Sequence, residues 1–129
     1  MEKINSITSK VLPKAVGPYS IATQFENLIF LSGQIPICPK TNQLIESDIE
    51  KQTIQVLENI KAFLNEQNLS FNNILKTTIY VKDMTDFGSI NEIYARYFTN
   101  YYPARALVEV SRLPKDVLIE IECIIAKTK

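Results

Sequence analysis

Apolar residues recur along this chain with two different periods, and the change of period separates predicted helices from predicted strands. Between residues 49 and 64 the apolar positions return every three or four residues, the spacing of one face of an amphipathic helix. Ser47 can cap the start of this helix, and Glu50, three residues later, completes a capping box. We expect the helix to end near residues 65–68 and to pack on a sheet.

A second helix is predicted after Asp83 or Thr85, either of which can cap it, because helical spacing of apolar residues returns from Phe87 to Phe98. Asn91 lies on or beside the apolar stripe of that helix. Strands are predicted where β-branched and aromatic residues or simple alternation replace the helical period, and the second and third of them should form a tight hairpin. These strands cover residues 4–8, 19–25, 28–32 and 74–81.

Residues 104–126 are predicted to form a closing β-hairpin with its turn at 112–116. Apolar residues occupy even positions in the first arm and odd positions in the second. Because directly opposed residues of an antiparallel pair share a face, one register brings both apolar sets onto a single core. The same register places Arg105, Glu120 and Glu122 together on the other face, where diagonal neighbours lie roughly 7–8 Å apart.

Two interpretations of this charged face are open. An exposed cross-strand ion pair is common and contributes little to stability. However, Leu107, Leu118 and Ile124 lie among the charges, and large aliphatic side chains indicate a face that is partly covered. A half-covered guanidinium and carboxylate could bind an anionic ligand and activate a water molecule.

The predicted order is strands, helix, strand, helix and two strands, without an internal repeat or a linker. It favours an α+β fold in which two helices pack on one face of a mostly antiparallel sheet. A chain of 129 residues is expected to form one domain, residues 1–129, with a substantial core. A second copy of the chain is the obvious candidate to cover the other sheet face.

Composition then narrows the possible functions. Fourteen basic and fourteen acidic residues cancel, and no long run of one sign is present, which disfavours nucleic acid as a partner. No apolar run has the length of a membrane span, and the N-terminus has no signal-peptide core. We therefore expect no membrane partner and a cytoplasmic location, with an organelle left open.

The chain contains no histidine, which removes Ser-His and Cys-His nucleophile pairs and histidine metal sites. Cys38 and Cys123 fit no metal-ligand spacing, so we expect no metal site and two free thiols, with Cys123 in the core. Acid-base chemistry then falls to carboxylate, lysine, tyrosine or cysteine side chains.

Several separate motifs resemble the RidA (YjgF) family in the right order over residues 14–126. They are Gly-Pro-Tyr-Ser at 17–20, Leu-Ser-Gly-Gln-Ile-Pro at 31–36, Thr-Thr-Ile-Tyr-Val-Lys-Asp at 77–83, Pro-Ala-Arg at 103–105, Val-Glu-Val at 108–110 and Arg-Leu-Pro-Lys-Asp at 112–116. The resemblance implies a chorismate-mutase-like homotrimer with a ligand cleft between each pair of subunits.

It also implies a cofactor-free hydrolase that detoxifies reactive metabolites, a 2-iminobutanoate/2-iminopropanoate deaminase that converts enamines and imines to keto acids and ammonia. The small-molecule partner would be an imino or keto acid. By matching motifs, Arg105 would bind the substrate carboxylate and Glu120 would position or activate water. The other residues that the resemblance places at the cleft are Tyr19, Ser32, Gly33, Asn91 and Leu107.

Leu107 is a departure from the family pattern, because many members have cysteine two residues after the arginine. A thiol is therefore not essential to any activity here. Leucine is larger and more apolar than cysteine, so we expect it to affect which substrates fit and not the chemistry itself. Two other functions stay open: a non-catalytic trimer that binds keto acids or acts like a chaperone, and an RNA-directed ribonuclease or translation inhibitor.

Overall fold

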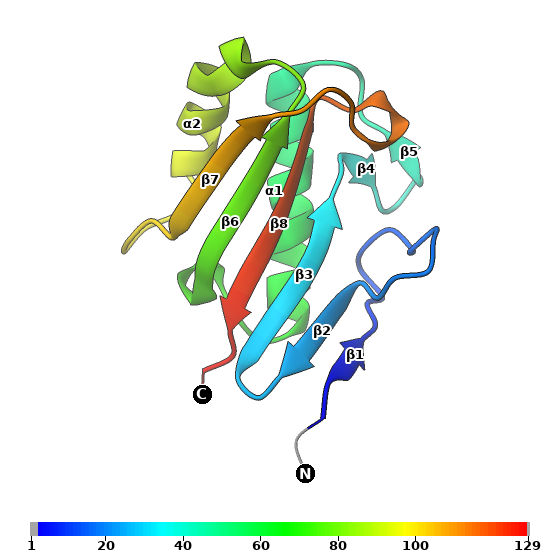
Figure 1. Ribbon diagram of the computed structural model, residues 1–129, viewed down its shortest axis with the longest axis vertical. Coiled ribbons are helices and arrows are strands. Elements are labelled where there is room, and N and C mark those ends of the chain that lie inside the picture. The colour runs from blue at the N-terminus through cyan, green and yellow to red at the C-terminus, as the bar shows by residue number, and fades with distance from the viewer. Residues whose placement is uncertain (1–2, 129) are drawn as a thin grey trace.

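A six-stranded sheet with two helices on one side forms the protein, as seen in a computed structural model that describes residues 3–128 (Figure 1). The sheet order is β1-β2-β3-β8-β6-β7, and β4 and β5 form a separate small hairpin. The strands are β1 (Asn5–Ile7), β2 (Ala22–Phe25), β3 (Leu28–Gln34), β4 (Ile37–Cys38), β5 (Gln43–Leu44), β6 (Ile74–Val81), β7 (Ala104–Glu109) and β8 (Ile119–Ala126), and the helices are α1 (Ile49–Glu66) and α2 (Phe87–Ala95).

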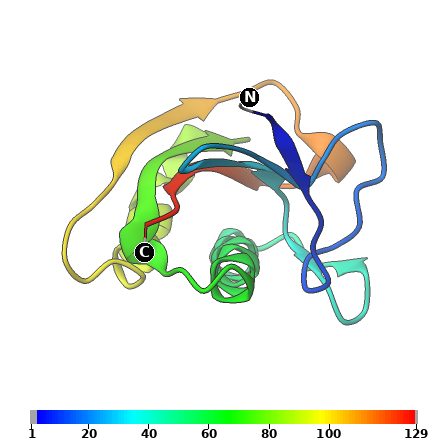
Figure 2. The ribbon, with the colours of Figure 1, turned by 90° about the horizontal axis from the view of Figure 1, so that it is seen from below.

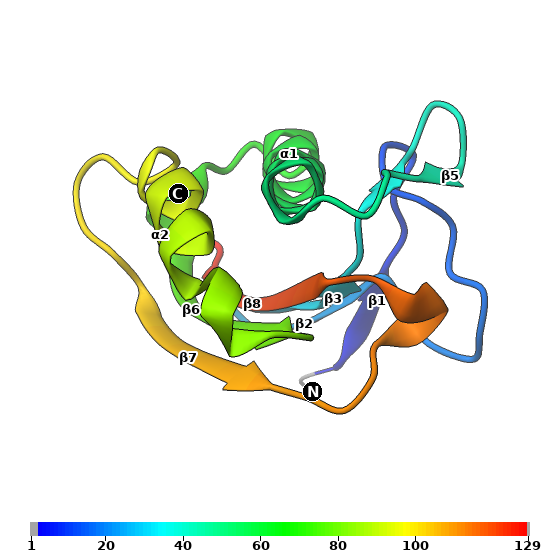
Figure 3. The same ribbon diagram turned by 90° about the horizontal axis from the view of Figure 1, so that it is seen from above.

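Both helices cover the same face of the sheet, and the other face is left uncovered by the described part of the chain (Figures 2 and 3). The core lies between these two layers, where the apolar stripe of α1 meets the inward-facing residues of the central strands. Val56, Ile60 and Phe63 of α1 are almost fully buried, as are Ile79 of β6 and Ile121 of β8. The predicted α+β fold with two helices on a mixed, mostly antiparallel sheet is confirmed.

The predicted closing hairpin is wrong. β7 and β8 are not neighbours, because β6 lies between them and pairs with both (Figure 1). β7 runs parallel to β6, and α2 makes the crossover that a parallel pair requires. β8 pairs antiparallel with β3 on one side and with β6 on the other. The last strand that the structure describes is thus a central strand of the sheet.

Local signals placed most of the other elements correctly. The strand predicted at 74–81 is β6, and the tight turn after β2 has Glu26 in the left-handed region with φ 52°. Helix α1 begins one residue later than expected: its cap is Asp48, not Ser47, and Asp48 Oδ1 accepts a hydrogen bond from the Lys51 N–H at 2.9 Å. An ionised carboxylate at the helix N-terminus also interacts favourably with the helix dipole.

A short 3₁₀ turn, which the sequence pattern did not predict, precedes the second helix. Asp83 caps a short 3₁₀ turn, Met84–Asp86, by accepting a hydrogen bond from the Thr85 N–H at 2.9 Å, and no side chain caps α2 itself. Cys123 is 3% exposed in the core, and both cysteines are free thiols, as predicted. Cys38 lies in the short β4–β5 hairpin rather than in an irregular loop.

A buried glutamine joins α1 to the start of β8. Gln52 is 3% exposed, and its Oε1 accepts a hydrogen bond from the Leu118 N–H at 2.8 Å. Its Nε2 donates to the carbonyl of Ile45 at 3.1 Å. Buried amides that are fully satisfied in this way fix the relative position of the segments they join. Gln52 therefore fixes the entry to β8 two residues before Glu120.

No helix within residues 3–128 is long and apolar enough to cross a membrane.

Candidate functional site

A β-bulge in β3 shapes the first of two candidate pockets. Leu31 is opposite Cys123 and Gln34 is opposite Ile121, so two residues of β3, Ser32 and Gly33, face a single residue of β8. Bulges of this kind bend a strand and are frequent beside functional sites. Here the bulge brings the backbone of Gly33 against the side chain of Glu120.

Gly33 is required at this position by space rather than by backbone angle. A Cβ added there would overlap the Glu120 carboxyl group, lying 2.8 Å from its Cδ. The absence of a side chain at residue 33 therefore lets the carboxylate lie directly on the bulge. Glycine commonly serves such close approaches in a strand.

Around this carboxylate lies a pocket of about 420 Å³, here called the Glu120 pocket. Ser32 has its hydroxyl tied to the backbone, because Oγ donates a hydrogen bond to the carbonyl of Ser20 at 2.7 Å. Tyr19 also lines the pocket and is 50% exposed. The residues that line this pocket include Tyr19, Ser32, Gly33, Pro114, Lys115 and Glu120.

Burial raises the pKa of Glu120, and the nearby Glu122 carboxylate raises it further. Glu122 is two residues along the same strand, and its Oε1 accepts a hydrogen bond from the Tyr80 hydroxyl at 2.7 Å. Both effects disfavour the charged form of Glu120. A half-buried carboxylate with a raised pKa is a stronger base than an exposed one, so Glu120 is suited to accept a proton from water.

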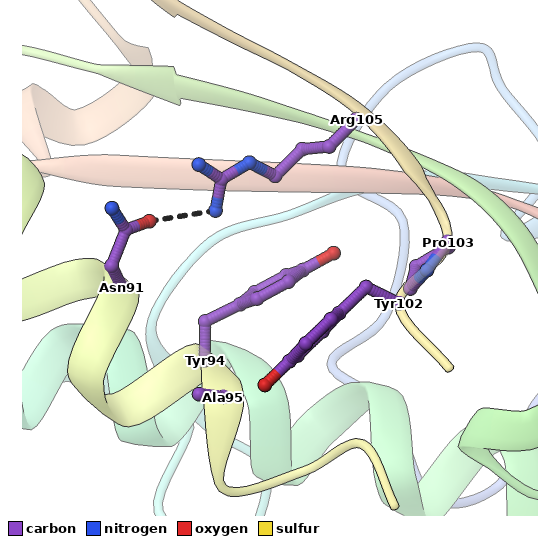
Figure 4. A pocket seen from close by; sticks show the side chains of 6 residues that line it. All are labelled: Asn91, Tyr94, Ala95, Tyr102, Pro103 and Arg105. Carbon is purple, nitrogen blue, oxygen red and sulfur yellow. Dashed lines mark hydrogen bonds between the residues drawn. The ribbon is translucent and has the colours of Figure 1, made fainter. Parts of the chain in front are cut away.

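Arg105 belongs to the opposite face of the sheet. In the sheet register Thr77 of β6 is beside both Arg105 of β7 and Cys123 of β8, so all three side chains share the face that packs on the helices. Arg105 Nη1 donates a hydrogen bond to Asn91 Oδ1 of α2 at 2.8 Å (Figure 4). Asn91 is the guanidinium's hydrogen-bond partner among the residues described, which leaves further N–H donors available to a ligand.

Two aromatic rings lie close to the guanidinium group. Arg105 Cζ lies 5.1 Å from the ring centroid of Tyr94 and 6.0 Å from that of Phe87, both within the range of cation–π attraction. Tyr94 is itself fixed, because its hydroxyl shares a buried 2.7 Å hydrogen bond with Thr77 Oγ1. Burial raises the pKa of Tyr94, so the ring stays neutral beneath the cation.

The second candidate pocket, here called the Arg105 pocket, opens between α2 and the segment that leads into β7 (Figure 4). Its volume is about 330 Å³. A guanidinium with free donors at one end of a cavity can bind a carboxylate through two parallel hydrogen bonds. The lining residues are Asn91, Tyr94, Ala95, Tyr102, Pro103 and Arg105.

The structure therefore divides the predicted site residues into two groups. Arg105 and Asn91 lie in one pocket, whereas Tyr19, Ser32, Gly33 and Glu120 lie in the other. The prediction that Arg105 and Glu120 share a sheet face is wrong, because it depended on the closing hairpin. Glu120 is instead beside Tyr80 of β6, whose other neighbour is Val108 of β7, on the face without helices.

Leu107 lines neither pocket. It lies beside Ile79 on the helix-covered face, where it is partly buried against the hydrophobic core. The backbone N–H at this position belongs to a sheet edge, because β7 is the last strand of the sheet order. In one chain, Leu107 is therefore a packing residue next to the Arg105 strand.

Several residues of the pockets were not predicted from sequence, among them Tyr94, Tyr102 and Lys115. Tyr94 follows Asn91 by three residues, which puts both on one side of a helix, and that spacing was the available signal. Lys115 borders the Glu120 pocket from a turn in which Lys115 and Asp116 both have positive φ, 55° and 56°. No pattern in the sequence indicates that two consecutive non-glycine residues adopt this conformation.

Comparison with known proteins identifies the family. The family model described as Endoribonuclease L-PSP, which represents the RidA/YjgF proteins, matches residues 9–127. The chain belongs to the RidA (YjgF) family. A RutC family protein of Pyrococcus horikoshii is 57% identical to this RidA-family chain over 115 residues, covering 89% of the chain and 91% of the relative.

Other RidA-family relatives carry more specific names. The 2-iminobutanoate/2-iminopropanoate deaminase of Escherichia coli K12 is 44% identical over 122 residues, covering 92% of this chain and 94% of the relative. A crystal structure of the Rid family protein YyfA from Yersinia pestis superposes with a TM-score of 0.92 at 47% identity, covering 96% of this chain and 99% of the other. The predicted family and its fold are thus confirmed.

Proposed function

We propose that the protein is a hydrolytic deaminase of enamines and imines derived from amino acids, with 2-aminoacrylate and 2-iminopropanoate as representative substrates. Membership of the RidA family and 44% identity to an E. coli protein named as such a deaminase support this function. The residue types also suit the chemistry. Arg105 can bind a carboxylate, and Glu120, with its raised pKa, can take a proton from water.

One observation carries the proposal further: the two charged residues are on opposite faces of the same sheet. A single chain cannot present both to one small molecule. Large apolar side chains also lie on the uncovered face: Phe30, opposite Ile124, is 43% exposed, and Val108, opposite Tyr80, is 40% exposed. We infer that the chain forms a homotrimer in which the Arg105 pocket of one subunit meets the Glu120 pocket of the next.

In the joined site Arg105 holds the substrate carboxylate, and Asn91 keeps the guanidinium aimed at it. An enamine first tautomerises to the imine, whose carbon is electrophilic. Glu120 orients a water molecule and accepts its proton while the water oxygen bonds to that carbon, then passes the proton to the imine nitrogen, giving a neutral carbinolamine. Glu120 next carries the hydroxyl proton to the amino nitrogen, so the carbon–nitrogen bond breaks as the carbonyl forms, and ammonia leaves behind a keto acid.

The reaction needs only moderate assistance, because imines hydrolyse readily in water. Positioning the two reactants converts a bimolecular step into an effectively unimolecular one, which alone lowers the barrier considerably. This chemistry can be carried by one guanidinium and one carboxylate. It therefore suits a chain without histidine.

The experiment measures release of pyruvate and ammonia while 2-aminoacrylate is generated in situ. The native protein should exceed the buffer rate, Arg105→Ala should abolish the acceleration, and Glu120→Gln should lower kcat by about 10²–10⁴-fold with a smaller effect on KM. Equal losses of turnover and ligand affinity in Glu120→Gln would contradict its role as the base.

A mixing experiment tests the shared site. Arg105→Ala and Glu120→Gln chains are refolded together at equal concentration. If each site takes Arg105 from one subunit and Glu120 from its neighbour, about a quarter of the sites in the mixture are intact and activity returns to that level. Each variant refolded alone is the control. No recovery in a mixture that forms trimers by mass would show that the two residues do not cooperate across subunits.

One alternative function has a specific observation in its favour, the name Endoribonuclease L-PSP of the matching family model. Zero net charge argues against RNA as the main partner. RNA cleavage that persists in Arg105→Ala after further purification would support the ribonuclease function. A folded trimer that binds keto acids without turnover would support the binding-protein or chaperone-like function.

A further inference from the structure

We propose that the Arg105 pocket receives the substrate side chain and selects imino acids with large apolar side chains, above all those with an aromatic ring. The inference rests on the proposed function, because it assumes that Arg105 holds the α-carboxylate. It adds a substrate class to that function. The carboxylate fixes one end of the molecule, so the surface next to Arg105 decides which side chain fits.

The lining of the pocket has one polar end and one apolar end. Arg105 and Asn91 lie together at the polar end, joined by their 2.8 Å hydrogen bond (Figure 4). The remaining lining consists of two tyrosine rings, Tyr94 and Tyr102, with Ala95 and Pro103. This polarity matches a ligand with a carboxylate head and an apolar or aromatic tail.

Tyr94 offers its ring to the pocket but not its hydroxyl group. That hydroxyl is engaged in a buried hydrogen bond with Thr77, and the residue is 4% exposed. A ligand side chain on this wall therefore meets carbon and not a free donor. A polar side chain would lose hydration there without gaining a partner, which costs free energy.

Both tyrosine walls rest on one buried residue, Phe98. Its ring centroid lies 4.7 Å from that of Tyr94 and 6.0 Å from that of Tyr102, and Phe98 is 8% exposed. Phe71 supports Phe98 from behind in an edge-to-face contact at 5.3 Å. These spacings are the favourable ones for aromatic pairs. The pocket is thus preformed by a chain of rings, which lowers the ordering cost of binding.

The volume of the pocket exceeds the needs of a three-carbon imino acid. In one chain the open pocket has a volume of about 330 Å³. A methyl side chain would leave much of the apolar lining in contact with solvent. A benzyl side chain would cover more of it and could stack on the exposed Tyr102 ring.

The first test measures binding and does not depend on turnover. Calorimetric titration compares phenylpyruvate with pyruvate, two keto acids that share the carboxylate and differ in side chain. We expect phenylpyruvate to bind at least about tenfold more tightly. Tyr102→Ala should lower the ratio of the two affinities by about tenfold, whereas Tyr102→Phe, the matched control, should retain it. Tyr102 is 64% exposed, so its truncation removes a wall without opening the core.

Equal affinities for the two keto acids, or a ratio that Tyr102→Ala leaves unchanged, would overturn the inference. A kinetic test then uses imines formed in situ from L-phenylalanine and L-alanine by an amino-acid oxidase. A higher kcat/KM for the phenylalanine-derived imine, reduced in Tyr102→Ala, supports the inference. Preferential binding of phenylpyruvate without hydrolysis of either imine would support the pocket's selectivity and overturn the deaminase function alone.

Discussion

Arg105 and Glu120 are held in place by different means. Arg105 is a long side chain on an edge strand, and other side chains restrain it: Asn91 by a hydrogen bond, and Tyr94 and Phe87 by their rings. Glu120 is on a central strand, and the shape of the backbone restrains it, through the β3 bulge and the missing Cβ of Gly33. The long, flexible Arg105 side chain is thus positioned by contacts with other side chains, whereas the shorter Glu120 side chain is positioned by the room that the backbone leaves for it.

Because the two residues are held independently, we expect that kcat and keto acid affinity can be lowered separately by substitutions in the two pockets. Gly33→Ala should displace the Glu120 carboxylate and lower kcat by about 10²-fold, because a misplacement of about 1 Å at a reacting group has effects of that size. Keto acid affinity, which depends mainly on Arg105, should fall much less. Steady-state kinetics together with pyruvate titration measures both.

Gly88→Ala is the matched control for this substitution. Gly88 lies in α2, and a Cβ added there meets nothing within 4 Å. Alanine also favours a helix more than glycine does, so this variant should be at least as stable as the native chain. A loss of keto acid affinity in Gly33→Ala as large as its loss of kcat would show that the two pockets are not independently held.

On the other side, Thr77→Val should loosen the support beneath Arg105. It removes the hydrogen-bond partner of the buried Tyr94 hydroxyl, which should lower the free energy of unfolding by about 1–3 kcal/mol. Keto acid affinity should fall as well, because Tyr94 carries the guanidinium. Denaturant unfolding and pyruvate titration provide the measurements.

The double variant Thr77→Val/Tyr94→Phe tests the reason for that loss. When both partners of a buried hydrogen bond become apolar, no unsatisfied group remains, and the change can be nearly neutral. Most of the lost stability should therefore return. A double variant as unstable as the sum of the two single variants would indicate that packing, and not the hydrogen bond, holds Tyr94.

The smallest expected effect concerns pH. Glu120 acts as a base in its ionised form, so its raised pKa makes kcat/KM fall as pH drops through a higher value than an ordinary carboxyl would give. Glu122→Gln removes one of the two causes of the raised pKa. The acidic limb of the pH profile should then move to lower pH, by less than about one unit, because burial is the larger cause.

Glu92→Gln, an exposed carboxylate of α2, serves as the control for this pH profile. Its replacement should leave the acidic limb where it is. An acidic limb that does not move in Glu122→Gln would mean that burial alone sets the ionisation of Glu120.

Sequence patterns predicted the helices and central strands well, because each carries a strong local signal. The 18 residues of α1 repeat their apolar positions over several turns, and β6 is rich in β-branched residues. The parity of β8 was also correct: Ile119, Ile121 and Cys123 face the core. β8 pairs with β3 on one side and with β6 on the other, so its alternation of apolar residues is set by burial.

The error lay in β7, where the local pattern is weak. As an edge strand, β7 places Arg105 and Leu107 towards the helices and leaves Val108 40% exposed on the other face, the reverse of what its apolar residues indicate. The division of the site between two sheet faces was missed for the same reason. Which strands pair is a long-range property that the alternation of apolar residues does not encode. The order strand, helix, strand over residues 74–109 was the available signal for a parallel pair.

The position of β8 also has a consequence for how the chain folds during synthesis. β8, which joins β3 to β6, is made after every other strand described in residues 3–128, so the N-terminal strands and the β6–β7 pair have no common partner until the ribosome reaches residues 119–126. Contacts between segments so distant in sequence form slowly, and unpaired strand edges are prone to aggregation in the meantime. A nascent chain that stops before residue 119 would be left as two unjoined halves of a sheet, a state in which chaperone binding is to be expected.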